Sequence, residues 1–382
     1  MGRTRSSKRV TLQQVADAAG VSRSAASFVM SGRTDQRIAQ STAEKIREIA
    51  QELGYRPNLT AKTLRTGTSG TVALISDFIG VTSRANSLVS GAMEALHDRE
   101  SLLFTVDTRG DSATELRAVQ ALLDRQVDGV LYASMFTREV HVPDLLSHTP
   151  TVLLNCLADN AGRSSESQNS NNVSENLDEQ GGFSVREVPC IIPDEYQAGR
   201  SAIAALLRAG HSTEISFVGC FPERVTGGAQ WNGWQPWALN QRLQGVKDAL
   251  GEAGLRLLSV YTADEWDCDA GRNIAMRMLA SGAGLPTAVV CVNDELAFGL
   301  VQVLQLKGVR VPEDISVVSF DGSPWAGASM PALTTLCLPH EELGRKAVEV
   351  LFDQRPLSGI AQKVLVPMPM REGQSIAAPR LT

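Results

Sequence analysis

Residues 11–67 read TLQQVADAAGVSRSAASFVMSGRTDQRIAQSTAEKIREIAQELGYRPNLTAKTLRTG, and this segment guides the interpretation of the whole chain. Thr11 can cap a helix, because its hydroxyl can accept a hydrogen bond from a free amide of the first turn. Apolar residues then recur at helical spacing, and Gly20 is a natural stop. Ser22 can cap a second helix, which we expect to run to about Met30. Two short helices joined by a turn of about three residues predict a helix-turn-helix unit.

The predicted second helix has an outward face that suits the recognition of DNA. Small polar and basic side chains near the start of such a helix can reach base edges in the major groove. A third helix is predicted at residues 41–53, followed by Gly54. The outward residues of the second helix are Arg23, Ser24, Ser27 and Phe28, and one face of the third carries Ile46, Ile49, Ala50 and Leu53. Three helices that share so few apolar residues make a very small core.

The charge distribution supports a DNA-binding head. Residues 1–70 contain 12 Lys and Arg against 5 Asp and Glu, a net charge of +7, whereas the whole chain carries −6. The other 312 residues therefore carry −13. A basic region on an acidic protein suits contact with phosphates at one end only. The alternative is an ordinary three-helix unit with a solvated basic face.

The pattern T-L-x-x-V-A-x-x-A-G-V-S, followed by E-K-I and G-Y-R-P-N, resembles the lactose-repressor (LacI/GalR) family of bacterial transcription regulators. The resemblance extends over nearly all of residues 9–372. It implies a double-stranded DNA operator as a partner, and it implies that a set of head and hinge residues lies at or near DNA. The predicted DNA-binding residues are Thr11, Ser22, Arg23, Ser24, Ser27, Phe28, Asn58 and Leu64.

The head departs from the family pattern in two places. Residues 25–28 read Ala-Ala-Ser-Phe where the family commonly has Thr-Val-Ser-Arg, so Phe28 replaces the usual arginine. A basic contact to a base edge is lost there, although a phenylalanine ring can contact a thymine methyl. The loop at residues 31–38 is also longer than in the lactose repressor. The operator sequence therefore cannot be transferred.

Residues 57–70 are expected to form a hinge helix and linker. This segment is too short to be a stable helix alone, because helices under about 12 residues are marginal in water. The resemblance implies that it orders when dimer and DNA are both present, and that Leu64 enters the minor groove. An apolar wedge of this kind unstacks a base step and bends the duplex. The alternative is that Leu64 is a plain apolar residue of a linker.

From residue 71 the hydrophobic period changes to short, nearly continuous apolar runs separated by helical stretches. This alternation predicts parallel strands that are covered on both faces. We expect an α/β body, 71–382, of two doubly wound parallel-sheet lobes that face a cleft, behind a helical head at 1–56. The resemblance implies a body similar to periplasmic sugar-binding proteins, in which the chain crosses between lobes three times. The predicted first lobe is about 71–192 and 338–360, and the second is about 193–337 and 361–382.

The length and composition predict a globular, cytoplasmic protein. The 382 residues are 43% hydrophobic and 20% charged, and the basic start lacks the apolar region of a secretory signal. No run approaches the roughly 20 apolar residues that span a membrane. Six scattered cysteines form no C-x-x-C pair, so we expect reduced, mostly buried thiols and neither a metal nor a cofactor. The sequence contains no G-x-S-x-G, Walker A or H-E-x-x-H motif, which argues against an enzyme.

Residues 160–182 are rich in Ser, Asn and Glu and almost devoid of apolar side chains. Such a segment cannot bury enough surface to offset its ordering entropy, so we expect a solvated loop. A role in binding a partner is the alternative.

Candidate effector-binding residues follow the apolar runs, because ligands of parallel α/β sheets usually lie at the carboxyl ends of strands. The resemblance places four of them where the family holds an effector, commonly a sugar: Asn155, Arg242, Asn293 and Asp321. Carboxylate and amide oxygens accept hydrogen bonds from hydroxyls, while arginine and amide N–H groups donate them. The full predicted set is Asp77, Phe78, Arg109, Asn155, Arg242, Asn293, Asp321, Trp231 and Trp234.

Several of these residues also have a structural interpretation. Asn293 or Asp294 can simply cap the following helix, and Asp321 can stabilise a turn before Gly322. Indole rings stack on sugars, but Trp231 and Trp234 belong to a loop that can equally be packed or lie in a dimer contact. Phe78 and Trp325 have the same two interpretations.

We therefore expect a homodimeric, effector-controlled transcription regulator, most simply a repressor that reads a near-palindrome and is released by a sugar. Three alternatives stay open. The effector can be a nucleobase or other corepressor that strengthens DNA binding. The protein can also be a sugar-binding receptor, or an α/β enzyme with a fused DNA-binding head.

Overall fold

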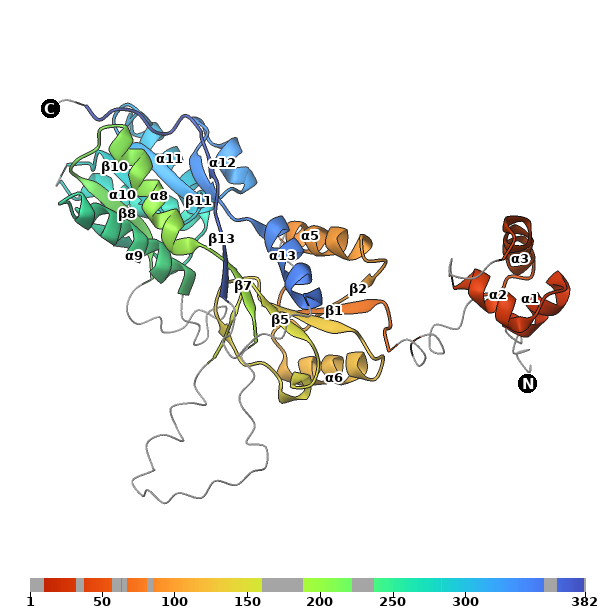
Figure 1. Ribbon diagram of the computed structural model, residues 1–382. Helices are drawn as coiled ribbons and strands as arrows, with labels where there is room; N and C mark the ends of the chain where they lie inside the picture. The colour runs from red at the N-terminus through yellow and green to blue at the C-terminus, as the bar shows by residue number, and fades with distance from the viewer. Residues whose placement is uncertain are drawn as a thin grey trace, which may run out of the picture. The chain divides into compact units, whose positions relative to one another are not determined.

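The structure is a computed structural model that describes residues 10–31, 38–56, 63, 67–80, 85–159, 188–221, 237–282, 284–353 and 363–380. The chain divides into two compact units, Met1–Ser69 and Gly70–Thr382 (Figure 1). Several predicted features lie outside the described residues: Asn58, Leu64, Trp231, Trp234 and the loop 160–182. Most of the predicted hinge helix lies outside them as well.

The head contains three helices, α1 (Leu12–Ala19), α2 (Arg23–Met30) and α3 (Gln40–Glu52). Both predicted caps of the helix-turn-helix are confirmed. The Thr11 hydroxyl accepts from the backbone N of Gln14, and the Gln14 side chain accepts from the backbone N of Thr11 at 2.8 Å. The Ser22 hydroxyl accepts from the backbone N of Ala25 at 3.1 Å. Gly20 ends α1 in the left-handed conformation with φ of 71°, as a terminating glycine should.

The core of the head is as small as predicted. Its buried side chains come from all three helices and are Val15, Ala16, Ala19, Ala26, Val29, Ile46 and Ala50. The prediction was wrong for Leu53, which is 40% exposed. The last turn of α3 ends at Glu52, so Leu53 is the capping residue beyond the helix and its side chain leaves the packing face.

The first lobe is built on a six-stranded parallel sheet of order β13-β7-β5-β3-β1-β2. Its strands are β1 (Thr71–Ser76), β2 (Leu102–Asp107), β3 (Gly129–Ala133), β5 (Thr151–Leu154), β7 (Cys190–Pro193) and β13 (Lys363–Val366). Helices α5 (Ala85–His97) and α13 (His340–Phe352) cover one face, and α6 (Ser112–Leu123) covers the other (Figure 1). Val72 and Leu74 of β1 pack in the first of these layers, and Ala73 and Ile75 pack in the second. Burial on both faces explains the continuous apolar runs of the sequence.

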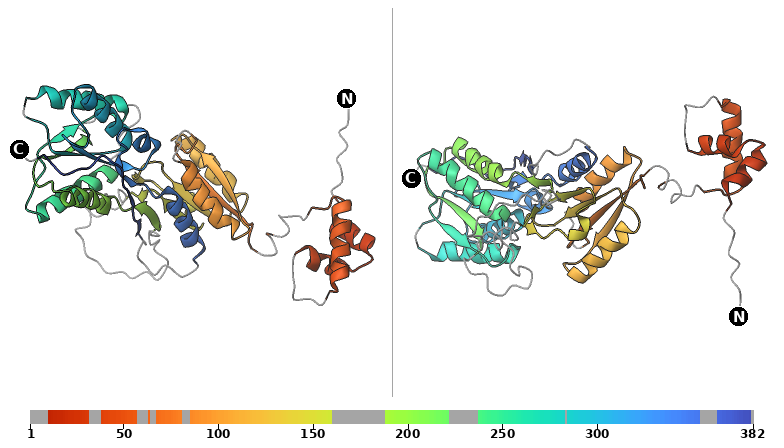
Figure 2. Two further views of the ribbon diagram at one scale, coloured as in Figure 1. Left: turned by 90° about the horizontal axis from the view of Figure 1, so that it is seen from above. Right: turned by 60° about the horizontal axis from the view of Figure 1, so that its bottom comes forward.

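The second lobe has a six-stranded sheet of order β14-β12-β11-β10-β8-β9. Figure 2 shows the two lobes as separate bodies, each a sheet with helices packed around it. Only β14 of this sheet pairs in the antiparallel sense. The strands are β8 (Ile215–Cys220), β9 (Val260–Thr262), β10 (Ala288–Cys291), β11 (Ser316–Asp321), β12 (Thr334–Cys337) and β14 (Met370–Arg371). The helices are α8 (Glu195–Arg208), α9 (Trp237–Glu252), α10 (Cys268–Ala280), α11 (Asp294–Leu306) and α12 (Pro324–Ala328). The doubly wound, two-lobed fold class is therefore confirmed.

The chain passes between the lobes three times, from β7 to α8, from β12 to α13 and from β13 to β14. The backbone N of Asp194 donates to the carbonyl O of Val366 at 2.8 Å, which ties the first passage to the third. We placed residues from 361 onward in the second lobe, and this boundary is wrong. Lys363–Val366 pairs in parallel with Cys190–Pro193, so the final passage follows Val366.

Three small elements lie after the first-lobe strands: β4 (Glu139–Val140), η1 (Asp144–Leu146) and β6 (Leu157–Ala158). All six cysteines are free, and four of them are buried. Within the described ranges, no three or more His, Cys, Asp or Glu side chains are grouped so that they could hold a metal ion. None of the helices in those ranges has the length and apolarity needed to cross a membrane.

His211 gives the second lobe a testable dependence on pH. Its ring is 1% exposed, and Nε2 lies 3.0 Å from the carbonyl O of Ala377, to which it can only donate. Burial lowers the pKa of His211 below its ordinary value. The native state therefore favours the neutral ring, and the associated stability is present above about pH 6.5 and lost as the pH falls below it.

We expect the free energy of unfolding to fall more steeply between pH 7 and pH 5 in the wild type than in His211→Gln. Urea denaturation at a series of pH values measures both slopes. The exposed His148 provides the matched control, because His148→Gln should keep the wild-type slope. Equal slopes for the wild type and His211→Gln would contradict the assignment.

Candidate functional site

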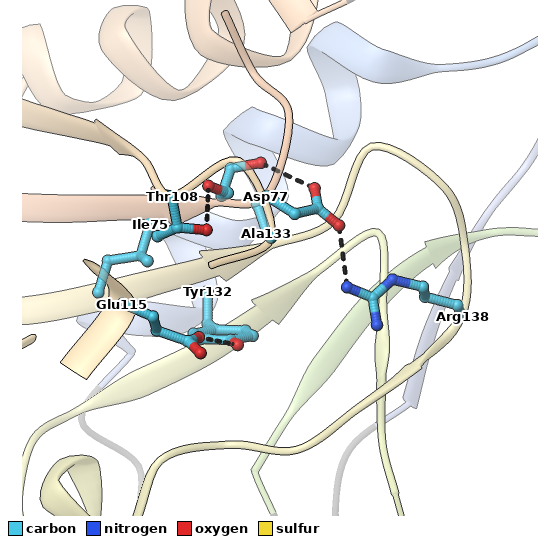
Figure 3. A pocket seen from close by; sticks show the side chains of 9 residues that line it. Ile75, Asp77, Thr108, Glu115, Tyr132, Ala133 and Arg138 are labelled. Atoms are coloured by element: carbon cyan, nitrogen blue, oxygen red, sulfur yellow. Dashed lines mark hydrogen bonds and ion pairs between the residues drawn. The ribbon is translucent and has the colours of Figure 1, made fainter. Parts of the chain in front are cut away.

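Asp77 organises the carboxyl ends of the first-lobe strands. This residue directly follows β1 and is buried. One carboxylate oxygen accepts from the backbone N of Phe78 at 3.0 Å and of Met135 at 3.1 Å. The other accepts from the Ser134 hydroxyl at 2.9 Å. It also accepts from Nη2 of Arg138 at 3.0 Å, as Figure 3 shows. Asp77 therefore joins the end of β1 to the segment that follows β3.

Asn155, at the end of β5, contacts the same segment. Its Oδ1 accepts from the Thr137 hydroxyl at 2.7 Å, and its Nδ2 donates to the carbonyl O of Ser134 at 2.9 Å. Asp77 and Asn155 were both predicted, and the structure brings them together through Ser134. The sequence reasoning missed Ser134, Thr137 and Arg138. These residues follow an apolar run just as the predicted ones do, so the same strand-end rule could have found them.

A small polar cavity of about 80 Å³ lies at these strand ends (Figure 3). The Tyr132 hydroxyl donates to the Glu115 carboxylate there, and burial together with this acceptor raises the pKa of Tyr132. A water molecule occupies about 30 Å³ in the liquid, so the cavity has room for single hydroxyl-sized groups rather than for a sugar ring. Its lining comprises Ile75, Ser76, Asp77, Thr108, Gly110, Glu115, Tyr132, Ala133 and Arg138.

Phe78 and Arg109 occupy the loops above β1 and β2. The Phe78 ring lies beside Gly110, where an added Cβ would be 3.4 Å from its Cζ atom. Arg109 is exposed and has a positive φ of 51°. Its backbone N donates to Asp107 at 2.9 Å, and the same carboxylate accepts from the backbone N of Gly80 at 2.8 Å. Asp107 thus holds both loops at the end of the sheet.

Arg242 is the centre of the second-lobe strand ends. It is buried on α9, and its Nε and Nη2 donate to the two carboxylate oxygens of Glu195 at 2.5 and 3.0 Å. Nη1 donates to the carbonyl O of Val292 at 2.6 Å, and Nη2 also donates to Asp321 at 3.2 Å. Four of the five N–H groups of the guanidinium are therefore committed inside the protein. Sequence reasoning found Arg242 and Asp321 but missed Glu195, which is the bidentate partner.

Helix packing explains how Glu195 reaches Arg242. Glu195 is the first residue of α8, which packs along α9. A Cβ added to Gly199 would lie 2.2 Å from the carbonyl O of Arg242, so only glycine allows this close approach. Burial raises the pKa of Glu195, and the adjacent Arg242 opposes that rise. Burial disfavours the charge on Arg242, but Glu195 and Asp321 outweigh it and raise the pKa of the guanidinium.

Asn293 and Asp294 have distinct structural roles. Asn293 is the residue that caps α11, since its Oδ1 accepts from the backbone N of Leu296 at 2.9 Å. Our alternative of Asp294 as the cap is therefore wrong. The Asp294 carboxylate accepts instead from the Ser319 hydroxyl and the backbone N of Ser323, both at 2.6 Å. Burial raises its pKa.

Aromatic side chains border Asn293. Its Nδ2 donates to the carbonyl O of Trp266 at 2.9 Å, and the Trp266 ring stacks on Phe221 with centroids 4.6 Å apart. Neither ring was predicted, because the tryptophans chosen from the sequence were Trp231 and Trp234. The ring centroids of Trp325 and Phe298 of α11 are 5.1 Å apart, which supports the packing interpretation for Trp325.

A larger cavity of about 560 Å³ lies between the lobes and brings Asp321 beside the starts of α5 and α13. The buried Ser323 hydroxyl lines it and makes no hydrogen bond within the described part of the chain. The lining comprises Ser87, Asp321, Gly322, Ser323, Pro324, Leu338, Pro339, His340, Glu341, Glu342 and Arg345. This cavity is large enough for a small molecule that contacts both lobes.

In the head, α2 presents Arg23 and Ser24 to solvent, and Ser27 and Phe28 are partly exposed. Thr11 and Ser22 act as helix caps. Backbone N–H groups at a capped helix start, together with an exposed basic residue, can contact phosphates and base edges.

The buried ion pair predicts a strong asymmetry in stability. Glu195→Ala leaves a buried guanidinium without its bidentate partner, which should lower the free energy of unfolding by about 3–5 kcal/mol. Replacing both partners by methionine should recover part of that loss, because both charges of this pair are then removed and only the contact of the guanidinium with Asp321 is lost. Urea denaturation measures both changes. The pair between Arg200 and Glu252 is also bidentate, through Nη1 and Nη2, but the Glu252 side chain is 65% exposed, so Glu252→Ala is the control and should change stability little. A double variant no more stable than Glu195→Ala would contradict this account.

Comparison with known proteins assigns both parts of the chain. Residues 11–58 match the model of the bacterial regulatory proteins of the lacI family, and residues 83–359 match that of the periplasmic binding proteins and sugar binding domain of the LacI family. Similar proteins include the ribose operon repressor of Haemophilus influenzae, 27% identical over 90% of this chain and 91% of that protein. The sucrose operon repressor of Escherichia coli is 28% identical over 90% of this chain and 94% of that protein. The HTH-type transcriptional repressor PurR of Vibrio vulnificus is 27% identical over 90% of this chain and 91% of that protein.

Solved structures share the fold. The lac repressor dimer bound to operator and the anti-inducer ONPF superposes with a TM-score of 0.71 at 21% identity, covering 97% of this chain and 100% of that one. The match to the larger family model spans well over half of the chain. The protein therefore belongs to the lacI family of bacterial regulatory proteins and is a DNA-binding transcription regulator with a ligand-binding body.

Proposed function

We propose that this protein is a homodimeric repressor that binds a pseudo-palindromic operator and is released from it by an uncharged, hydroxyl-rich effector such as a sugar. The observation that carries the effector class is the ion pairing of Arg242. A guanidinium that already forms ion pairs with Glu195 and Asp321 is a poor partner for an anionic ligand.

The balance of buried charge supports an uncharged effector. At the described strand ends, the buried carboxylates include Asp77, Glu195, Asp294 and Asp321, and Arg138 and Arg242 form ion pairs with three of them. An added phosphate or carboxylate would lie close to these carboxylates in surroundings of low dielectric constant. Hydroxyl groups would instead donate to carboxylate oxygens, and the Ser323 hydroxyl offers a further hydrogen bond.

The three passages between lobes supply the mechanical part of the proposal. The cavity between the lobes includes Asp321 of the second lobe and the start of α13, which directly follows the passage out of β12. An effector that bridges the two lobes would favour one angle between them. That angle would couple to the segment 57–70 and to operator affinity. Such coupling is reciprocal and typically about 1–3 kcal/mol.

The head supplies the DNA-binding part of the proposal. The residues proposed to contact the operator are Thr11, Ser22, Arg23, Ser24, Ser27, Phe28, Asn58 and Leu64. The net charge of +7 on residues 1–70 would attract the phosphate backbone in a salt-dependent manner. Two heads related by a dimer axis would read the two half-sites of a near-palindrome.

An exposed apolar surface supports the dimer. Strand β2 is at the edge of the first sheet, and it exposes Leu102 by 63% and Phe104 by 42%. Met93 of α5 and Leu116 of α6, the helices on the two faces of this sheet, are about half exposed. An edge strand with exposed apolar side chains is a natural site of association.

Operator release should depend on the charge of the effector. We expect a labelled duplex from the gene's own promoter region to bind, and a neutral sugar from a panel to weaken that binding. The phosphate ester of the same sugar should have little effect. Asp321→Asn should retain operator affinity but require at least about tenfold more effector, because a hydrogen bond to a charged group is lost. Fluorescence anisotropy at fixed salt measures each affinity.

Glu252→Gln, an exposed change in the same lobe, is the control for this experiment and should respond normally. A duplex that binds more tightly with effector would make the protein a corepressor-type regulator instead. A phosphate ester that acts better than its parent sugar would refute the proposed effector class.

The dimer should depend on the edge of the first sheet. Phe104→Lys places a charge in the apolar surface and should shift the protein toward monomer in sedimentation equilibrium. Leu145→Lys, at a residue of similar exposure in η1, should leave the dimer intact. If both variants remain dimeric, the contact lies elsewhere.

A further inference from the structure

Lys363 and Trp237 make a side-chain contact that crosses from one lobe to the other. Lys363 is the first residue of β13 in the first lobe, and Trp237 is the first residue of α9 in the second lobe (Figure 1). The Nζ atom of Lys363 lies 4.7 Å from the centroid of the Trp237 ring. An ammonium group within about 6 Å of a ring centroid is attracted by the negative face of the ring, and tryptophan is the strongest aromatic partner. A cation–π interaction therefore joins the two lobes.

The indole of Trp237 differs from the other apolar side chains of its helix. Leu239, Val246 and Leu250 of α9 are buried in the core of the second lobe. Trp237 is only partly buried, and among the described residues it does not belong to the set that packs against that core. Its ring interaction is with the ammonium group of the first lobe. The contribution of this contact therefore depends on how the two lobes are placed.

The contact lies away from the passages about which the lobes would turn. Val366, the last residue of β13, accepts from the backbone N of Asp194 beside the first passage. Lys363 begins the same strand, so its Cα is about 10 Å from that point at about 3.3 Å per residue. Moving Nζ about 2 Å farther from the ring would take it beyond the roughly 6 Å over which the attraction acts. The strength of the contact therefore depends on the angle between the lobes.

We propose that Lys363 and Trp237 form a latch that favours the angle between the lobes found in this structure. A cation–π contact at an exposed site changes an equilibrium by about two- to fivefold, so the latch biases the angle without fixing it. The bias is a property of the body and requires neither effector nor DNA. Its effect on operator affinity rests on the proposed coupling of that angle to the segment 57–70.

Amide hydrogen exchange of the full-length protein tests the latch without a ligand. The backbone N of Asp194 is bonded to Val366 across two passages, so its exchange reports how often the lobes move far enough to break that bond. Lys363→Met removes the charge and keeps an unbranched chain, and Trp237→Leu removes the ring. Each change should speed exchange at Asp194 about two- to fivefold. The double variant should exchange no faster than either single variant, because all three lose the same contact.

Two controls separate the latch from a general loss of stability. Lys363→Arg keeps a cation above the ring and should retain the exchange rate of the wild type. Arg99→Met removes a cation 5.5 Å from the ring of Phe352 within the first lobe, and it should leave exchange at Asp194 unchanged. In the latch variants, low concentrations of urea should hardly change this rate, because motion between folded lobes exposes little surface.

The outcomes separate the latch from the proposed function. Unchanged exchange at Asp194 in Lys363→Met and Trp237→Leu would overturn the latch, as would additive effects in the double variant or a steep dependence on urea. Fluorescence anisotropy then measures operator affinity, which should shift by one common factor in these three variants. If exchange changes as expected while operator affinity does not, the latch stands and the proposed coupling to the operator fails.

Discussion

The buried guanidinium of Arg242, held between Glu195 and Asp321, is the interaction around which the ligand-binding body is arranged. Its three members come from the start of α8, the first turns of α9 and the end of β11. Burying a single charge costs several kcal/mol, so this group is stable only because both carboxylates and the Val292 carbonyl surround it. Glu195 follows directly on the first passage between the lobes. The ion pair therefore fixes the second lobe at the point where the chain enters it.

In the first lobe, a different ion pair lies at the strand ends. Asp77 and Arg138 lie at the ends of β1 and β3 and are joined by Ser134, which also contacts Asn155. Both lobes thus end their parallel strands in a network of charged and polar groups whose hydrogen bonds are mostly satisfied internally. The remaining acceptors are carboxylate oxygens and hydroxyls. That composition is consistent with the hydroxyl-rich effector proposed for the cavity between the lobes.

The head is organised by different physics. Its core is limited to seven buried side chains, six of which are alanine or valine, so hydrophobic burial contributes little. The side-chain caps at Thr11 and Ser22 and the left-handed Gly20 therefore largely determine where the helices of the helix-turn-helix begin and end. These features leave the exposed face of α2 free to vary in sequence. Phe28 in place of the family's usual arginine is an example of that freedom.

The sequence by itself determined the features that depend on neighbouring residues. Caps, helix ends and apolar runs are local, so the helix-turn-helix and most strands of the two sheets could be predicted, but β12, β13 and β14 were not, and the resemblance to a known family supplied the two-lobed arrangement. Candidate strand-end residues such as Asp77, Asn155 and Asp321 followed from the same local rule. The tertiary structure alone decided which of these side chains meet. Glu195 and Arg242 are 47 residues apart, and Arg242 and Asp321 are 79 apart, so no local pattern links them. The placement of β13 beside β7 and the choice of Asn293 over Asp294 as a cap also depended on packing, because strand pairing and side-chain direction are set by the assembled sheet rather than by the residues alone.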